Sequence, residues 1–240
     1  MRYPSDEFTP EMVTPEVQKY IRRQFDKISR KNDLDVVIEK TCANSLRVGY
    51  VDKLLPDAKY IFIVRDGLDA VGSALHLWTA SLDVPYLMRK ARYVPPSDLP
   101  YYALRYMKHR MYRMFSKEKR LAMWGPAMDD IDELLMQYSL PEVCALQWQA
   151  CVDKAETSFS EIKPDRIIRV RYEDFVLEPF IEYEKIARFI GKDVPDEVET
   201  YLKVNINSAS INKGRSYLAA SGVSALRPLI ADTMERYGYE

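Results

Sequence analysis

Two short, strongly apolar runs in the middle of the chain have the length and composition of β-strands. Lys59–Val64 (KYIFIV) is apolar without alternation, and Asp165–Val170 (DRIIRV) is a second run of similar length. Continuous apolar character is typical of a strand that is covered on both faces, as in a parallel sheet. A β-branched run at Asp35–Glu39 (DVVIE) predicts one further strand ahead of them.

Segments with helical signals lie between and around these strands. Thr14 followed by Pro15 marks a helix start, because the threonine hydroxyl can cap free N–H groups and proline has its φ angle preset. Gly191 is the corresponding stop signal, since glycine readily ends a helix in the left-handed conformation. The helices that we expect cover 15–30, 44–55, 68–82, 141–162, 179–190 and 221–237.

Strands that alternate with helices imply right-handed crossovers and therefore a parallel sheet. The expected fold class is α/β, with a central parallel sheet flanked by helices in one domain over residues 1–240. Residues 83–137 are rich in Tyr, Met and Arg and break the alternation, so they predict a helical insertion with a long helix over 101–119. Ligands of such sheets bind beyond the carboxyl ends of the strands, where we expect the site.

Composition excludes several classes of partner. The 35 basic and 36 acidic residues nearly cancel, so no overall field would gather nucleic acid or an anionic membrane, and an anion site must be local. Three cysteines are too few for a disulfide framework, which favours the cytoplasm. No apolar run has the length of a membrane span, and no His, Cys and Asp cluster has the spacing of metal ligands.

Polar side chains follow each expected strand: Lys40–Thr41 the first, Arg65–Gly67 the second and Arg171–Asp174 the third. The carboxyl ends of parallel strands share one rim of the sheet. Arg65 offers a rigid fork of donors there, and Ser73, eight residues later, adds a hydroxyl near the positive end of the next helix. Together they predict a site for a phosphate dianion, the alternative for Arg65 being a local ion pair with the adjacent aspartate.

These residues carry a resemblance to a known family. Residues 39–78 (EKTCANSLRVGYVDKLLPDAKYIFIVRDGLDAVGSALHLW) and 170–179 (VRYEDFVLEP) resemble two signatures of the sulfotransferases, and 211–218 (INKGRSYL) and 234–240 (MERYGYE) resemble later parts of the same proteins. The resemblance implies the P-loop NTPase-like sulfotransferase fold. It also implies transfer of a sulfuryl group from 3′-phosphoadenosine 5′-phosphosulfate (PAPS) to a hydroxyl or amine acceptor.

Roles for residues near the transferred group follow from the resemblance. Arg65 and Ser73 would grip the 3′-phosphate of PAPS. Lys40 would place a compact positive charge near the sulfuryl oxygens, with a surface charge as the alternative. Cys42 stands where the cytosolic branch of the family has a histidine, which leaves the base unassigned. His76, one turn after Ser73, is the candidate base that we name, against the alternative of a structural histidine.

Other residues would surround the nucleotide. The resemblance places Tyr172 near the nucleotide, although a packing tyrosine is an equal alternative in a chain with 17 tyrosines. Lys213, Gly214 and Arg215 correspond to a flexible lid over the same 3′-phosphate in some branches, the alternative being a solvated loop. Glu173 is expected to cap the segment that follows it rather than to take part in catalysis.

One departure from the family pattern concerns the other end of PAPS. The family normally opens with a strand and a glycine- and serine-rich loop, of the kind PRSGTT, that cradles the 5′-phosphosulfate with backbone N–H groups. The chain has only 8 glycines and no such loop before Lys40, so we expect an N-terminally truncated sulfotransferase. A degenerate relative that binds adenosine 3′,5′-bisphosphate or a protein partner is the alternative. A nucleoside-phosphate kinase is disfavoured because no Walker loop is present.

The expected partners are therefore PAPS and one acceptor, which is a small molecule, a glycan or a protein.

Overall fold

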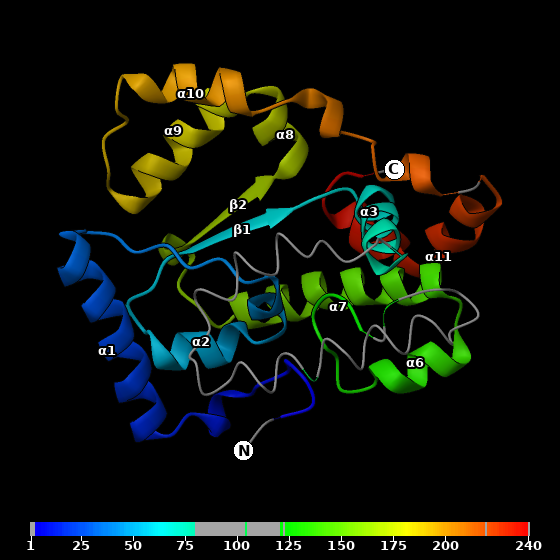
Figure 1. Cartoon of the computed structure of the whole chain (residues 1–240), viewed down its shortest axis with the longest axis horizontal. Coiled ribbons are helices and arrows are strands. Elements are labelled where there is room, and N and C mark those ends of the chain that lie inside the picture. Colours follow the sequence, from blue (N-terminus) through cyan, green and yellow to red (C-terminus); the bar gives the residue numbers. More distant parts are fainter. Residues whose placement is uncertain (1–2, 80–103, 105–120, 122, 219, 240) are drawn as a thin grey trace.

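The computed structural model describes residues 3–79, 104, 121, 123–218 and 220–239 of the chain. Helices make up most of it, and the strands lie between groups of helices, as Figure 1 shows. The elements are α1 (Pro15–Asn32), α2 (Val48–Leu54), β1 (Tyr60–Val64), α3 (Gly67–Thr79), α6 (Ile131–Gln137), α7 (Leu140–Phe159), β2 (Ile167–Arg171), α8 (Tyr172–Leu177), α9 (Pro179–Ile190), α10 (Glu197–Asn205) and α11 (Ala220–Arg236). Short 3-10 turns connect several of them, among them η5 (Ser208–Ser210) and η6 (Arg215–Tyr217).

The two strands form a parallel pair, with Tyr60 opposite Ile167 and Val64 opposite Arg171. Helices α8, α9 and α10 group together on one side of this pair, and α2 and α7 lie on the other (Figure 1). The expected α/β class with a parallel sheet is therefore confirmed. Both strands also end at the same edge, which brings the residues after Val64 and after Arg171 close together.

Several element boundaries follow from local chemistry that the sequence already shows. The Thr14 hydroxyl accepts the backbone N–H of Val17 at 3.3 Å and starts α1. Helix α7 begins with a capping box, in which Ser139 and Glu142 satisfy each other's free N–H groups. Gly191 ends α9 with φ of 77°, a left-handed conformation that glycine adopts without strain.

The main core lies where α3, α7 and α11 pack together next to the sheet. Its largest fully buried side chains include Trp78 and Leu68 of α3 and Ile230 and Met234 of α11. Full burial of such side chains stabilises a fold by about 1.5–3 kcal/mol each. Helix α3 is consequently held along its length, and its first turn is fixed at the carboxyl end of β1.

Two sequence predictions differ from the structure. The segment Asp35–Glu39 is not a strand, and no described strand other than β2 pairs with β1. A β-branched run becomes a strand only where a neighbouring backbone accepts its hydrogen bonds, so composition alone is insufficient. The helix expected over 44–55 is divided at Arg47, and the Asn44 side chain bonds Glu39 and Arg47 instead of capping α2.

The predicted helical insertion is tested only at its end, where α6 occupies 131–137. The long helix expected over 101–119 lies outside the described residues, apart from the single position 104. None of the helices in the described part of the chain is both long and apolar enough to cross a lipid bilayer.

A candidate anion-binding site at the carboxyl end of β1

The connection between β1 and α3 consists of Arg65 and Asp66, and both strands of the sheet fix its position. The Asp66 carboxylate accepts the backbone N–H of Asp69 at 2.7 Å and so caps the first turn of α3. The backbone N–H of Asp66 itself donates to the Glu173 carboxylate at 3.0 Å, and Glu173 belongs to α8, directly after β2. The helix start is therefore tied to both strand ends.

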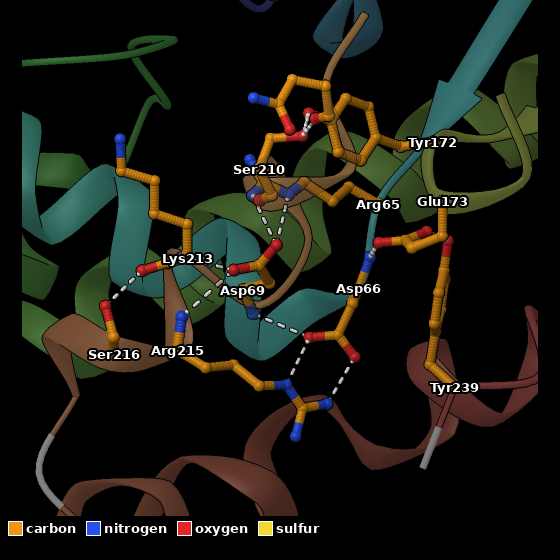
Figure 2. Close-up of polar contacts among 12 residues, drawn as sticks. Arg65, Asp66, Asp69, Tyr172, Glu173, Ser210, Lys213, Arg215, Ser216 and Tyr239 are labelled. Atoms are coloured by element: carbon orange, nitrogen blue, oxygen red, sulfur yellow. Dashed lines mark hydrogen bonds and ion pairs between the residues drawn. The ribbon is translucent and has the colours of Figure 1, made fainter. Parts of the chain in front are cut away.

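Arg65 is held by contacts with three residues (Figure 2). Its Nε donates to Oδ2 of Asp69 at 2.7 Å, and its Nη2 bonds the same oxygen and the carbonyl of Ser210, the latter at 3.0 Å. The guanidinium also lies over the ring of Tyr172, 4.7 Å from its centroid. No described residue accepts a hydrogen bond from Nη1 of Arg65. The guanidinium is thus held in one orientation by these three residues.

Tyr172 contributes to the same cluster through its hydroxyl, which donates to Oγ of Ser210 at 2.9 Å. Because the residue stands at the start of α8 and Ser210 ends η5, this bond joins the β2 side of the sheet edge to the polar segment that precedes α11.

Asp69 joins Arg65 to the Lys-Gly-Arg step. Its carboxylate is fully buried, and its Oδ1 accepts the backbone N–H groups of Gly214 at 2.5 Å and Arg215 at 3.1 Å. A buried carboxylate is tolerated only when charged or hydrogen-bonded groups replace its water shell. One guanidinium and two backbone N–H groups do so here.

Arg215 forms a second forked ion pair, with Asp66. Its Nε and Nη2 donate to the two carboxylate oxygens at 3.1 and 2.6 Å, a bidentate geometry that is stronger than a single contact. The hydrogen bond with Asp66 raises the pKa of the Arg215 guanidinium. The Lys213 side chain is exposed and extends away from the Asp69 carboxylate (Figure 2).

Two glycines let the Lys-Gly-Arg step approach α3 closely. A Cβ atom on Gly72 would lie 1.9 Å from the carbonyl oxygen of Gly214, and a Cβ on Gly214 would lie 1.8 Å from the backbone oxygen of Asp69. Neither distance is possible for a real side chain, so any larger residue must move the loop. The lid residues of the sequence analysis therefore pack directly against the first turns of α3.

Ser73 and His76 lie farther along α3. Ser73 is partly buried and follows Asp69 by four residues, which puts both on the same face of the helix. His76 is exposed and stacks on Tyr217 of η6, with ring centroids 4.4 Å apart and planes 10° from parallel. Both residues consequently line the side of α3 that faces the 211–217 segment.

Lys40 is separate from this cluster in its contacts. It is exposed, and its ammonium lies 3.1 Å from the Sγ atom of Cys42. In the described ranges no hydrogen bond or ion pair joins the Lys40 side chain to Asp66, Asp69 or Glu173. Those ranges also contain no group of three or more His, Cys, Asp or Glu side chains placed to hold a metal ion.

Two residues of the cluster were missed or misread in the sequence. Asp69 follows Arg65 by four residues, the spacing of a helical ion pair, and that signal was available. Glu173 was expected to cap its own segment, which was wrong, since it accepts the Asp66 N–H and the hydroxyl of Tyr239 at 2.6 Å. The hydroxyl oxygen of Tyr239 also lies 3.1 Å from the carbonyl oxygen of Val64, and burial raises the pKa of this hydroxyl.

Comparison with known proteins gives the family and the fold of the chain. The model of the sulfotransferase family matches residues 3–122 and 108–196. The solved structure of sulfotransferase STF9 from Mycobacterium avium is similar, with a TM-score of 0.54 and 16% identity over 96% of this chain and 49% of that one. The sulfotransferase domain from the curacin biosynthetic pathway is similar with a TM-score of 0.53 and 12% identity, over 92% of this chain and 68% of that one.

The chain thus spans about half the length of the Mycobacterium avium sulfotransferase. No curated protein matches the sequence significantly. At such low identities the two solved structures show a shared fold, whereas the family match covers most of the sequence. The chain belongs to the sulfotransferase family.

Proposed function

We propose that this chain takes part in sulfuryl transfer from PAPS to a hydroxyl or amine acceptor, and that Arg65 and Ser73 bind the 3′-phosphate of the donor. The observation that carries the proposal is the convergence at the end of β1. Arg65 is oriented there by Asp69, Tyr172 and the segment that bears the Lys-Gly-Arg step. Asp69 thus links Arg65 to the backbone of Gly214 and Arg215, and the family resemblance assigns all three of these partners to one phosphate.

The chemistry of this place suits a phosphate dianion. Nη1 of Arg65 is available for a charge-assisted hydrogen bond, the kind that is about twice as strong as a neutral one. Ser73 can add a hydroxyl, and the first turns of α3 add the positive end of a helix dipole. Lys213 is exposed at the neighbouring loop, where its flexible side chain can turn toward a bound anion.

In the reaction, an acceptor oxygen or nitrogen attacks the sulfur atom, the bond from sulfur to the 5′-phosphate oxygen breaks, and adenosine 3′,5′-bisphosphate leaves. The acceptor proton passes to a base. The protein contributes chiefly by positioning and by stabilising the charge on the transferring and leaving oxygens. We assign the charge near the sulfuryl group to Lys40, whose exposed ammonium lies beside Cys42. His76, at the exposed rim of α3, is the candidate base.

Contacts to the 5′-phosphosulfate are not assigned to residues of this chain, because its sequence contains no glycine- and serine-rich phosphate loop. The lack of this loop in the sequence favours one alternative function, in which the protein does not catalyse transfer but binds adenosine 3′,5′-bisphosphate or a protein partner. The acceptor class, and the cytoplasmic location expected from the cysteine content, remain predictions from the sequence.

A transfer assay separates the two functions. The protein is incubated with PAPS that carries a radioactive sulfuryl group and with pooled alcohol, amine, glycan and protein acceptors. We expect labelled product, and we expect Arg65→Ala to raise the KM for PAPS by about 10- to 100-fold, the worth of one charged hydrogen bond. Arg22→Ala, which removes an exposed arginine paired with Asp57 on the surface, is the control. Binding of adenosine 3′,5′-bisphosphate without any transfer would favour the degenerate binder.

A further inference from the structure

Asp69 is the most completely buried charged side chain of the site, and it faces two different partners. Its Oδ2 atom holds the guanidinium of Arg65, while its Oδ1 atom holds the backbone N–H groups of Gly214 and Arg215. One carboxylate therefore connects the arginine at the end of β1 with a segment 145 residues away.

The local structure of α3 leaves this carboxylate available for such contacts. Asp69 stands three residues after the helix cap Asp66, the position from which an acidic side chain often bonds back to the N–H of the cap. Here Glu173 accepts that N–H instead. The Asp69 side chain is thus not needed for capping, and it points sideways toward Arg65 and the loop (Figure 2).

We propose that Asp69 is a positioning residue that couples the 211–217 segment to Arg65, so that the loop and the guanidinium adopt their ligand-binding positions together. For its ligand this inference rests on the proposed function, because the coupled groups are those assigned to the 3′-phosphate. The coupling itself is a property of the protein without ligand and can be measured separately.

The coupling requires both oxygen atoms of the carboxylate. An asparagine side chain has one acceptor oxygen and one NH₂ donor. In Asp69→Asn the NH₂ group must face either Arg65 or the N–H groups of Gly214 and Arg215, and both are donors. One of the two partners is therefore released and the other is held by an uncharged, weaker acceptor, although the side chain keeps nearly the same shape.

Gly72 gives an independent way to move the loop. Its added Cβ would meet the carbonyl oxygen of Gly214 at 1.9 Å, so Gly72→Ala must displace the segment while every polar side chain of the site remains. Gly222 in α11 is the matched control, because a Cβ at that position meets nothing within 4 Å. Both substitutions replace a helical glycine by alanine, and only the first one affects the loop.

The sign of the change in affinity distinguishes positioning from simple electrostatics. Asp69→Asn removes a negative charge beside the expected dianion, so Coulomb interaction alone predicts tighter binding. Positioning predicts the opposite. We expect adenosine 3′,5′-bisphosphate to bind about 10- to 100-fold more weakly to Asp69→Asn, as for loss of one charged hydrogen bond, and adenosine 5′-phosphate to bind unchanged. A purely structural defect would weaken both ligands alike.

Hydrogen exchange in the protein without ligand tests the coupling itself. We expect the amides of Gly214 and Arg215 to exchange at least about tenfold faster in Asp69→Asn and in Gly72→Ala than in the wild type or in Gly222→Ala. Thermal unfolding of each variant shows whether it is folded. If Asp69→Asn does not fold, the exchange of the Gly214 and Arg215 amides in Gly72→Ala tests the coupling.

The outcomes separate this inference from the proposed function. Wild-type affinity for adenosine 3′,5′-bisphosphate in folded Asp69→Asn, or unchanged exchange at Gly214 and Arg215 in both variants, overturns the inference. A wild-type protein that does not bind adenosine 3′,5′-bisphosphate, but whose variants exchange as expected, overturns the proposed function and leaves the coupling standing.

Discussion

Replacement of Arg65 by methionine removes the cation that faces the buried Asp69 carboxylate and keeps a side chain of similar length. Breaking a buried ion pair on one side destabilises a protein by about 3–5 kcal/mol, because a charge is left without its partner. Here the Arg65 side chain is 24% exposed, and Asp69 keeps two backbone N–H donors. We therefore expect Arg65→Met to lower the free energy of unfolding by about 2–3 kcal/mol, which is less than the loss for a fully buried ion pair.

The double variant Arg65→Met with Asp69→Asn tests this cause. Its residue 69 carries no charge, so we expect it to be less destabilised than the sum of the single variants by at least about 1 kcal/mol. The pair of Lys203 and Glu199 is the control, with the same spacing of four residues but side chains that are 70% and 48% exposed. Lys203→Ala is expected to change the free energy of unfolding by less than about 0.5 kcal/mol.

Urea unfolding at pH 7, followed by tryptophan fluorescence, measures all of these variants, since Trp78 is fully buried and reports on the core. Additive effects in the double variant, or a loss in Arg65→Met no larger than that in Lys203→Ala, would refute the reasoning.

Two further predictions follow from pKa shifts. Burial raises the pKa of Tyr60, Tyr237 and Tyr239, so the unfolded chain ionises first and stability falls as the pH rises above about 10. Each tyrosine is expected to lower the free energy of unfolding, measured with urea, by at most about 0.7 kcal/mol per pH unit. This is half of the full slope, because the rings are partly solvated. A free energy of unfolding that stays constant up to about pH 11.5 would contradict the prediction. Burial also raises the pKa of the Cys144 thiol to about 12, whereas Cys42 is exposed beside an ammonium group. At pH 8 only ~10⁻⁴ of Cys144 would be thiolate, so iodoacetamide should label Cys42 first, and equal labelling of the folded protein would oppose this assignment.

Those features that depend on neighbours in the sequence were predicted well. Thr14 starts α1, Gly191 ends α9, and the two longer apolar runs are the paired strands β1 and β2. Each depends on the cap, φ angle or apolar character of a few adjacent residues. The positions of Arg65 and Tyr172 at one edge of the sheet also agree with the rule that parallel strands deliver the residues after them to one side.

The partners within the site could not be predicted in the same way. An ion pair of Arg65 with the adjacent Asp66 was the alternative to a ligand role, but Arg65 pairs with Asp69 and Asp66 pairs with Arg215. The second pair joins residues 149 positions apart, and no local pattern encodes it. The same holds for Glu173, whose partner is set by how close the two strand ends lie.

The 35–39 segment shows why strand propensity alone did not predict a strand correctly. Its β-branched residues have strand propensity, yet this propensity reflects packing on a pleated surface more than an intrinsic preference of the backbone. In the described residues β1 pairs with β2 alone, and Ile38 is 68% exposed. Lys40 therefore does not stand at the end of a strand, and its assigned position near the sulfuryl group stays a prediction.

Isothermal calorimetry with two nucleotides tests the 3′-phosphate assignment most directly. We predict that adenosine 3′,5′-bisphosphate binds the wild-type protein and that adenosine 5′-phosphate binds poorly. Arg65→Ala and Ser73→Ala should each remove most of this difference, while Arg22→Ala should preserve it. Equal binding of both nucleotides by the wild type, or an unchanged preference in Arg65→Ala, would contradict the assignment.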